Sequence, residues 1–114
     1  MMHTETSDQD RSQYVSAVLE AYRNNPDTLG HVRASDRKLA RHFFDGRVPL
    51  KVVRAALALA ALRRVCRADG ADPHEPIRSL HYFKPVIEEL SKLPADSAYF
   101  TYIEIRMREY PAAQ

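Results

Sequence analysis

Six cationic residues between positions 37 and 54 are the side chains of this sequence best suited to bind a ligand. Guanidinium and ammonium groups gathered on one surface can contact phosphates without reading base sequence. The first three share one face of a helix, because residues three and four apart are neighbours there. The sequence therefore predicts a surface that binds DNA or RNA, formed by Arg37, Lys38, Arg41, Arg47, Lys51 and Arg54.

The charge around these residues is unevenly distributed along the chain. The 114 residues carry 17 Lys and Arg against 15 Asp and Glu, a formal net charge of +2. Residues 31–67 alone hold ten basic residues against two acidic ones, and the two flanking parts are acidic. A basic segment of this kind favours a polyanion or an acidic protein as partner. The alternative is that the acidic ends pair with the basic middle inside one fold.

Residues that could form a catalytic or metal site are scattered along the sequence. The single cysteine, Cys66, has no histidine near it in the sequence and is interpreted as structural. No zinc-binding, nucleophile or glycine-rich phosphate motif is present. We therefore expect no enzyme, no metal and no cofactor. The histidines, of which the third and fifth are expected on helix surfaces, are His3, His31, His42, His74 and His81.

Helices are the elements that must position the basic residues. Apolar residues recur at helical spacing, and three glycines with no tryptophan argue against strands and turns. We predict an all-α fold, a single compact bundle of five or six helices around a buried central helix at about 49–68. Within it, Leu57 and Leu59 are expected to be buried. The run of apolar residues at 55–62 is far shorter than the ~20 residues of a membrane helix.

The expected domain boundaries follow from composition. The first ten residues are polar and have no apolar signal segment, and a lone cysteine suits a reducing compartment, so we expect a cytoplasmic protein without a membrane partner. We expect a flexible tail at 1–10, one domain at 11–111 and a second tail at 112–114. Besides the central helix, the expected helices are at about 11–23, 36–45, 76–83, 85–92 and 97–110, with a loop at 24–34 and a turn at 69–75.

Capping residues, glycine and prolines set the expected ends of these helices. Asp10 and Ser35 are the expected N-caps. Gly46 is expected to end its helix in a left-handed conformation, and Pro49 to begin the central helix. Pro85 lies inside an apolar helical pattern and is expected to break or kink it, because proline lacks the N–H that a helix interior requires.

Residues 39–53 resemble a helix-turn-helix, with a short helix, a turn at Gly46 and a second helix. A recognition helix needs an exposed polar face that reaches base edges. The second helix is apolar at 55–62, which leaves only Lys51 and Arg54 to project near its start. We therefore favour contacts to phosphates over the reading of bases.

Two motifs carry a resemblance to known proteins. The first, which begins at Val48, is Val-Pro-Leu-x-Val-Val-x-x-Ala-Leu; the second, which begins at Pro76, is Pro-Ile-x-Ser-Leu-x-Tyr-Phe-x-Pro-Val-Ile-Glu-Glu-Leu. They resemble small helical proteins of bacterial mobile elements and plasmids, and are loosely similar to the C-terminal helical domain of DnaD-like replication proteins. The resemblance covers roughly 14–110. It implies a DNA-associated role beside replication or transposition.

Tyr82 and Phe83 in the second motif allow two interpretations. Aromatic rings can stack on unpaired bases. Both residues also continue the apolar pattern of Leu80 and Ile87, which favours a place in the core.

Two hypotheses of function follow. The first is a non-catalytic accessory protein of a bacterial replication or mobile-element system, which binds nucleic acid by phosphate contacts from the six basic residues. The second is a helical protein–protein adaptor whose basic face meets an acidic partner. Salt dependence separates them, because phosphate binding releases counterions. Self-association is left open.

Overall fold

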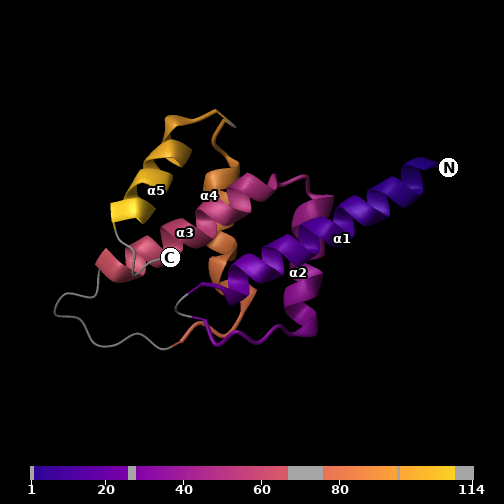
Figure 1. The fold of residues 1–114 in the computed structure, drawn as a ribbon, viewed down its shortest axis with the longest axis horizontal. Coiled ribbons are helices and arrows are strands. Elements are labelled where there is room, and N and C mark those ends of the chain that lie inside the picture. The colour runs from indigo at the N-terminus through magenta and orange to yellow at the C-terminus, as the bar shows by residue number, and fades with distance from the viewer. Residues whose placement is uncertain (1, 26–27, 67–75, 95, 110–114) are drawn as a thin grey trace.

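The described part of the chain is helical (Figure 1). A computed structural model describes residues 2–25, 28–66, 76–94 and 96–109, without the side chains of 2–7, 65 and 66. No strand occurs in these residues, and one isolated parallel bridge joins Thr28 to Ile77. The predicted all-α class is confirmed. The elements are α1 (Met2–Arg23), α2 (Ala34–Asp45), α3 (Leu50–Cys66), the 3-10 turn η1 (Leu80–Phe83), α4 (Lys84–Ser91) and α5 (Ala98–Glu109).

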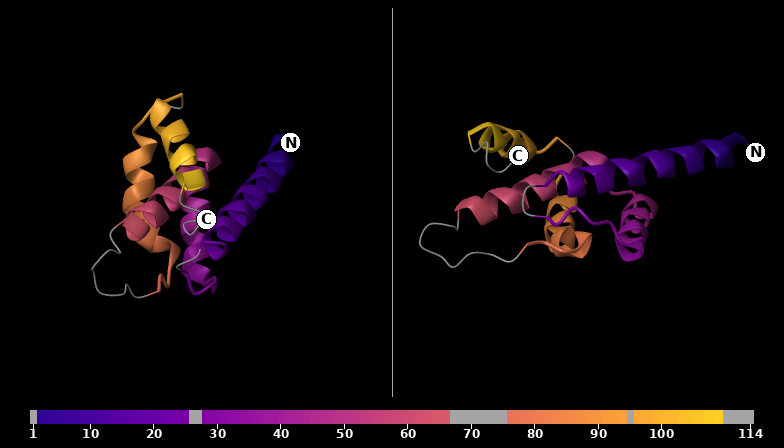
Figure 2. Two further views of the ribbon diagram at one scale, coloured as in Figure 1. Left: turned by 60° about the vertical axis from the view of Figure 1, so that its left-hand side comes forward. Right: turned by 60° about the horizontal axis from the view of Figure 1, so that its bottom comes forward.

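Helix α3 packs against α1, α4 and α5, whereas α2 packs against α1 and η1 (Figures 1 and 2). Leu57 and Leu59 of α3 are 3% and 6% exposed, so their predicted burial is confirmed. Buried alanines of α3, such as Ala56 and Ala60, allow neighbouring helices to approach closely. The apolar core therefore gathers on α3 and draws residues from every described helix.

Helix α1 begins much earlier than expected. It starts at Met2, so the expected start of the helix at Asp10 is wrong. Residues 2–10 contain neither proline nor glycine, so no residue type among them opposes continuation of the helix. The second half of α1 contributes to the core, through residues such as Val18 and Tyr22. The first turns project beyond the other helices (Figures 1 and 2).

The left-handed residue that follows α2 lies one position later than expected. Val48 N–H donates to the Phe43 carbonyl at 3.0 Å and Arg47 N–H to the Phe44 carbonyl at 2.9 Å, the paired bonds of a Schellman ending. This pattern places the left-handed conformation at Arg47, whose φ is 60°, and not at Gly46, whose φ is −81°. The expected left-handed Gly46 is therefore wrong.

The segment predicted as a helix at 76–83 is helical only in its second half. Leu29 N–H donates to the Ile77 carbonyl at 3.1 Å, beside the bridge between Thr28 and Ile77. Because this pairing uses the backbone of residue 77, residues 76–79 stay outside the helix. Pro85 then lies in the first turn of α4, where a missing N–H has no consequence. The predicted break at Pro85 is confirmed.

The remaining boundaries lie close to the expected ones. α3 begins at Leu50, directly after Pro49, and α5 spans Ala98–Glu109. The expected turn at 69–75, the tail at 112–114 and the surroundings of Cys66 lie outside the described residues. None of the described helices combines the length and the apolar character that crossing a bilayer requires.

Candidate nucleic-acid interface

The buried carboxylate of Asp36 fixes α2 in place. Asp36 is fully buried, and its Oδ2 accepts a hydrogen bond from the Arg33 N–H at 2.9 Å. Its Oδ1 accepts from the Ser79 hydroxyl and from the Leu80 N–H, both at 2.9 Å. These bonds compensate for the removal of the carboxylate from water. Asp36 therefore both caps the start of α2 and ties α2 to η1. The expected N-cap at Ser35 is wrong, since α2 already begins at Ala34.

The three predicted residues on α2 share its outward side. The inward side of α2 carries Asp36, Leu39, Ala40 and Phe43. Helical geometry places positions 37, 38 and 41 away from these four. All three side chains are exposed, as expected. We call Arg37, Lys38 and Arg41 the α2 basic face.

Acidic residues of the described chain do not neutralise the α2 basic face. Its three residues form no ion pair with any described residue. Arg63, by contrast, donates two hydrogen bonds to the Glu89 carboxylate, at 2.8 and 3.2 Å, which lower the pKa of that carboxyl group. Internal pairing of the basic middle with an acidic end therefore holds for Arg63 on α3 but not for α2.

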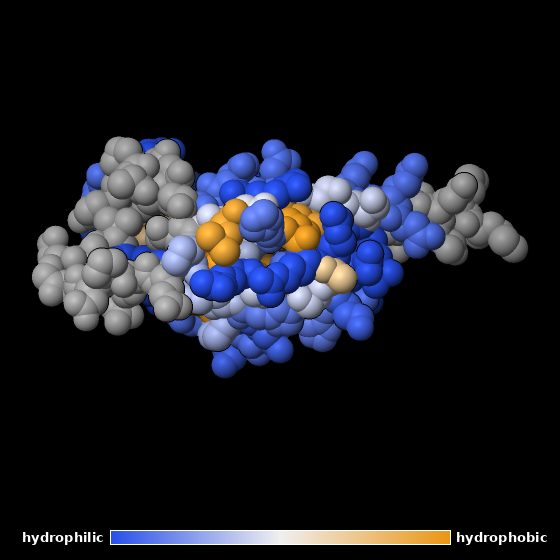
Figure 3. Space-filling view, turned by 90° about the horizontal axis from the view of Figure 1, so that it is seen from below, coloured by the Kyte–Doolittle hydropathy of each residue, from blue (hydrophilic) through white to orange (hydrophobic). Residues whose placement is uncertain are grey.

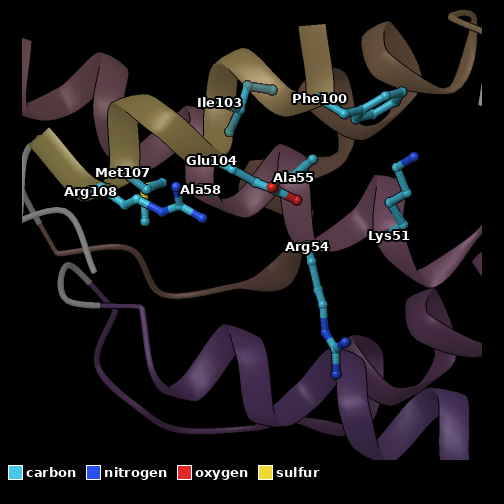
Figure 4. Close-up of a pocket in the computed structure, with 9 residues that line it drawn as sticks. All are labelled: Lys51, Arg54, Ala55, Ala58, Phe100, Ile103, Glu104, Met107 and Arg108. Atoms are coloured by element: carbon cyan, nitrogen blue, oxygen red, sulfur yellow. The ribbon is translucent and has the colours of Figure 1, made fainter. Parts of the chain in front are cut away.

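The other three predicted residues lie on different surfaces. Arg47 lines a hollow with Tyr14 and Leu50. Lys51 and Arg54 line a groove between α3 and α5 (Figure 4). The Lys51 ammonium lies 4.9 Å from the centre of the Phe100 ring on α5, a cation–π contact. The structure thus brings Arg37, Lys38 and Arg41 together and places Arg47, Lys51 and Arg54 elsewhere.

Three further basic residues adjoin the α2 basic face, and sequence reasoning did not include them. His42, His81 and Lys84 line a hollow with Lys38, Ser35 and Leu39, of about 320 Å³. The signals in the sequence were local: 38 and 42 are four apart on α2, and 81 and 84 are three apart across the junction of η1 and α4. Only the tertiary contact between α2 and η1 makes these two pairs neighbours.

Tyr82 and Phe83 have opposite environments. Phe83 is fully buried, which confirms its assignment to the core, whereas Tyr82 is 48% exposed, so the core assignment is wrong for it. In a 3-10 turn, residues three apart lie on the same side. Leu80 and Phe83 therefore both face inward, and Tyr82 faces outward. The Arg64 guanidinium lies 5.6 Å from the Tyr82 ring centre and donates to its hydroxyl at 3.2 Å.

Most of helix α3 is covered by other helices, so only a narrow strip of it could enter a DNA groove. Its sides are covered by α1, α4 and α5. The uncovered strip that carries Lys51 and Arg54 lines the groove beside α5. The packing of α3 therefore disfavours a helix-turn-helix that reads bases.

The surface seen from below Figure 1 is largely hydrophilic around one apolar patch (Figure 3). Large exposed apolar side chains are few in the described part of the chain: Leu29, Tyr82, Tyr102 and Ile105. Scattered residues of this kind are normal on a protein surface. This face thus offers a partner charged and polar contacts around an apolar patch.

No group of three or more His, Cys, Asp or Glu side chains that could hold a metal ion occurs among the described residues. No protein-family model, no curated protein and no solved structure matches the chain.

Proposed function

We propose that this chain is a non-catalytic nucleic-acid-binding protein that contacts phosphates through the α2 basic face. The observation that carries the proposal is the exposure of Arg37, Lys38 and Arg41 on one helix without an acidic partner among the described residues. Cations left unpaired in the fold can release counterions from a nucleic acid, which drives binding that depends on salt and not on sequence.

The way α2 is held supports this proposal. Asp36 bonds it to η1, and Phe43 and Leu39 anchor it in the core. Arg37 and Arg41 stand about one helical turn, ~5.4 Å, apart along the axis. A fixed helix that presents two guanidinium groups at this spacing can contact one backbone strand at two points with little loss of backbone freedom.

The wider role proposed is that of an accessory protein in a bacterial replication or mobile-element system. Its support is the resemblance carried by the motifs at Val48 and Pro76. Arg47, Lys51 and Arg54 are proposed as secondary contacts, which a nucleic acid reaches only where it extends past α2.

A titration of labelled DNA and RNA of several sequences, single- and double-stranded, tests the proposal. At about 50 mM salt, a condition that favours phosphate contacts, wild-type protein should bind all of them. Binding should not depend on base sequence, since phosphates carry none of it. Absence of measurable binding at this salt concentration overturns the proposal.

A second candidate function is a protein–protein adaptor, and the groove between α3 and α5 favours it. The groove has a volume of about 450 Å³ and an apolar floor that includes Phe100, Ile103 and Met107. Lys51 and Arg108 stand at its rim with a single acid, Glu104, and the Arg54 side chain points away from α5 (Figure 4). Apolar grooves of this kind accept one face of an amphipathic helix, and the basic rim favours an acidic one.

A designed acidic amphipathic peptide serves as the probe for the adaptor function. Ala58→Leu adds bulk to the groove and leaves the α2 basic face unchanged. If the groove binds such a helix, wild-type protein should bind the peptide and the variant should not, while DNA binding stays the same in both. Equal peptide binding by both proteins removes the groove from consideration.

A further inference from the structure

The hollow between α2 and α4 is lined by a distinct type of residue. Its polar lining consists of Ser35 and four basic side chains, Lys38, His42, His81 and Lys84, and no acidic residue contributes. All four basic side chains are exposed at its edges, and Leu39 is the buried residue that lines it. We call this space the α2–α4 hollow.

The two walls of the α2–α4 hollow are joined directly beneath it. Lys38 and His42 come from α2, His81 from η1 and Lys84 from the start of α4. Asp36, two positions before Lys38, accepts the hydrogen bonds of Ser79 and Leu80, which immediately precede His81. The basic side chains therefore converge on a space whose walls are held at a set separation.

One acidic residue lies beside the α2–α4 hollow. Glu88 of α4 lines a smaller adjoining hollow of about 110 Å³, in which His42 and Lys84 also take part. The two adjoining hollows are thus lined by two ammonium groups, one carboxylate and two imidazoles. The net charge is positive without the imidazoles and rises further when they are protonated.

We infer that the α2–α4 hollow binds a single phosphate group, held by the basic side chains and the Ser35 hydroxyl that line it. The phosphate is of the kind that a nucleic-acid backbone presents, and in this respect the inference rests on the proposed function. Lys38 belongs to both surfaces, so a phosphate in the hollow continues the path of a strand along the α2 basic face.

The electrostatic gain has a definite direction and size. A unit positive charge about 4 Å from a phosphate in water strengthens binding about fivefold. Lys38 and Lys84 supply two such charges, whereas Glu88 opposes them with one. Removal of one ammonium group that reaches the phosphate should therefore weaken binding about fivefold.

The test is a titration of a short single-stranded oligonucleotide at one fixed pH and salt concentration. Lys84→Gln should bind about fivefold more weakly than wild type. Lys92→Gln, at an exposed position outside the hollow, is the matched control and should bind as wild type does.

A second titration uses inorganic phosphate, with the imidazole NMR signals of His42 and His81 as the readout. Signals that shift with phosphate while the oligonucleotide does not bind would support the site and contradict the proposed function. Oligonucleotide binding that Lys84→Gln weakens no more than Lys92→Gln does would overturn the inference and leave the proposed function standing. Circular dichroism of each variant confirms that it is folded.

Discussion

The buried carboxylate of Asp36 accepts the backbone N–H of Leu80 at 2.9 Å, across 44 positions of the chain. Another oxygen of the same carboxylate accepts the N–H of Arg33 at the start of α2. One side chain thus joins the helix that carries the α2 basic face to the 3-10 turn beside it. The orientation of the candidate site depends on this residue, although Asp36 itself cannot contact a ligand.

Asp36→Ala should destabilise the protein by about 2–4 kcal/mol, because it leaves the buried donors of Arg33, Ser79 and Leu80 without an acceptor. Urea denaturation measures the loss. Ser79→Ala is the matched control: it leaves the carboxylate two other donors and also removes the acceptor of the His81 N–H, so it should cost about 1–2 kcal/mol. Equal losses in the two variants would contradict the role given to Asp36.

Leu57→Ala should cost about 2–5 kcal/mol through lost burial and the cavity that remains. Leu57 is 3% exposed on α3, in contact with the core shared by the other helices. Leu29→Ala makes the same chemical change at a position 46% exposed and should cost no more than ~0.5 kcal/mol. Thermal melts of both variants check the prediction, which fails if the two shift the midpoint equally.

Arg47→Gly should stabilise the protein by about 0.5–1 kcal/mol. Arg47 has a φ of 60°, a left-handed conformation that costs a residue with a side chain ~1–2 kcal/mol. The greater freedom of glycine in the unfolded chain offsets part of the gain. Arg47→Ala removes the same guanidinium but keeps a Cβ, so it should bring no gain. A stabilising alanine would show that loss of the guanidinium, and not relief of the backbone, is responsible.

Stability should fall between about pH 10 and about pH 12 because of Tyr14. Burial raises the pKa of Tyr14 from 10.0 to about 12, and its hydroxyl donates to the Val48 carbonyl at 2.7 Å. The native protein then holds a proton that the unfolded chain has lost, so the stabilisation is complete below pH ~10 and disappears as pH rises through the native pKa. Burial raises the pKa of Tyr22 too, which acts in the same direction.

Urea midpoints at about pH 8 and about pH 11, on either side of the ordinary tyrosine pKa, measure this dependence. Tyr14→Phe should cost about 1 kcal/mol at the lower pH, where it loses one hydrogen bond, and should decline less at the higher pH. Tyr102→Phe, at a residue 50% exposed, should decline as wild type does. A decline of Tyr14→Phe as steep as that of wild type would contradict the assignment.

Local patterns predicted those parts of the fold that depend on local forces. The apolar run of α3 and the periodicity of α2 and α5 were sufficient, because burial of an apolar face decides whether such segments are helical. The left-handed residue shifted from Gly46 to Arg47 because the pair of Schellman hydrogen bonds outweighs the intrinsic preference of glycine. Residues 76–79 left the helix because Ile77 pairs with a segment far away in the sequence.

For the candidate site too, local sequence patterns predicted some features and tertiary packing decided the others. Exposure of Arg37 and Arg41 followed from their spacing opposite Leu39 and Phe43 on α2. The separation of Lys51 from these two arginines did not follow from the sequence, because it depends on where α5 lies over α3. The α2–α4 hollow was also beyond prediction, since it exists only because Asp36 bonds α2 to η1.

The central claim is that the α2 basic face contacts phosphates, and the salt dependence of DNA binding tests it most directly. For duplex DNA, each phosphate contact contributes about −0.9 to the slope of log affinity against log salt concentration. The variant Arg37→Ala, Arg41→Ala should therefore bind every sequence more weakly and with a slope smaller in magnitude by about two.

The matched control is Arg23→Ala, Arg108→Ala, which removes the same charge from exposed positions outside α2. The measurement is the slope of both variants and of wild type, from titrations between about 50 and about 200 mM salt. The account predicts that only the α2 variant loses about two contacts and that the control keeps the wild-type slope. An equal slope in the two variants would contradict it, because binding would then follow net charge and not this face of α2.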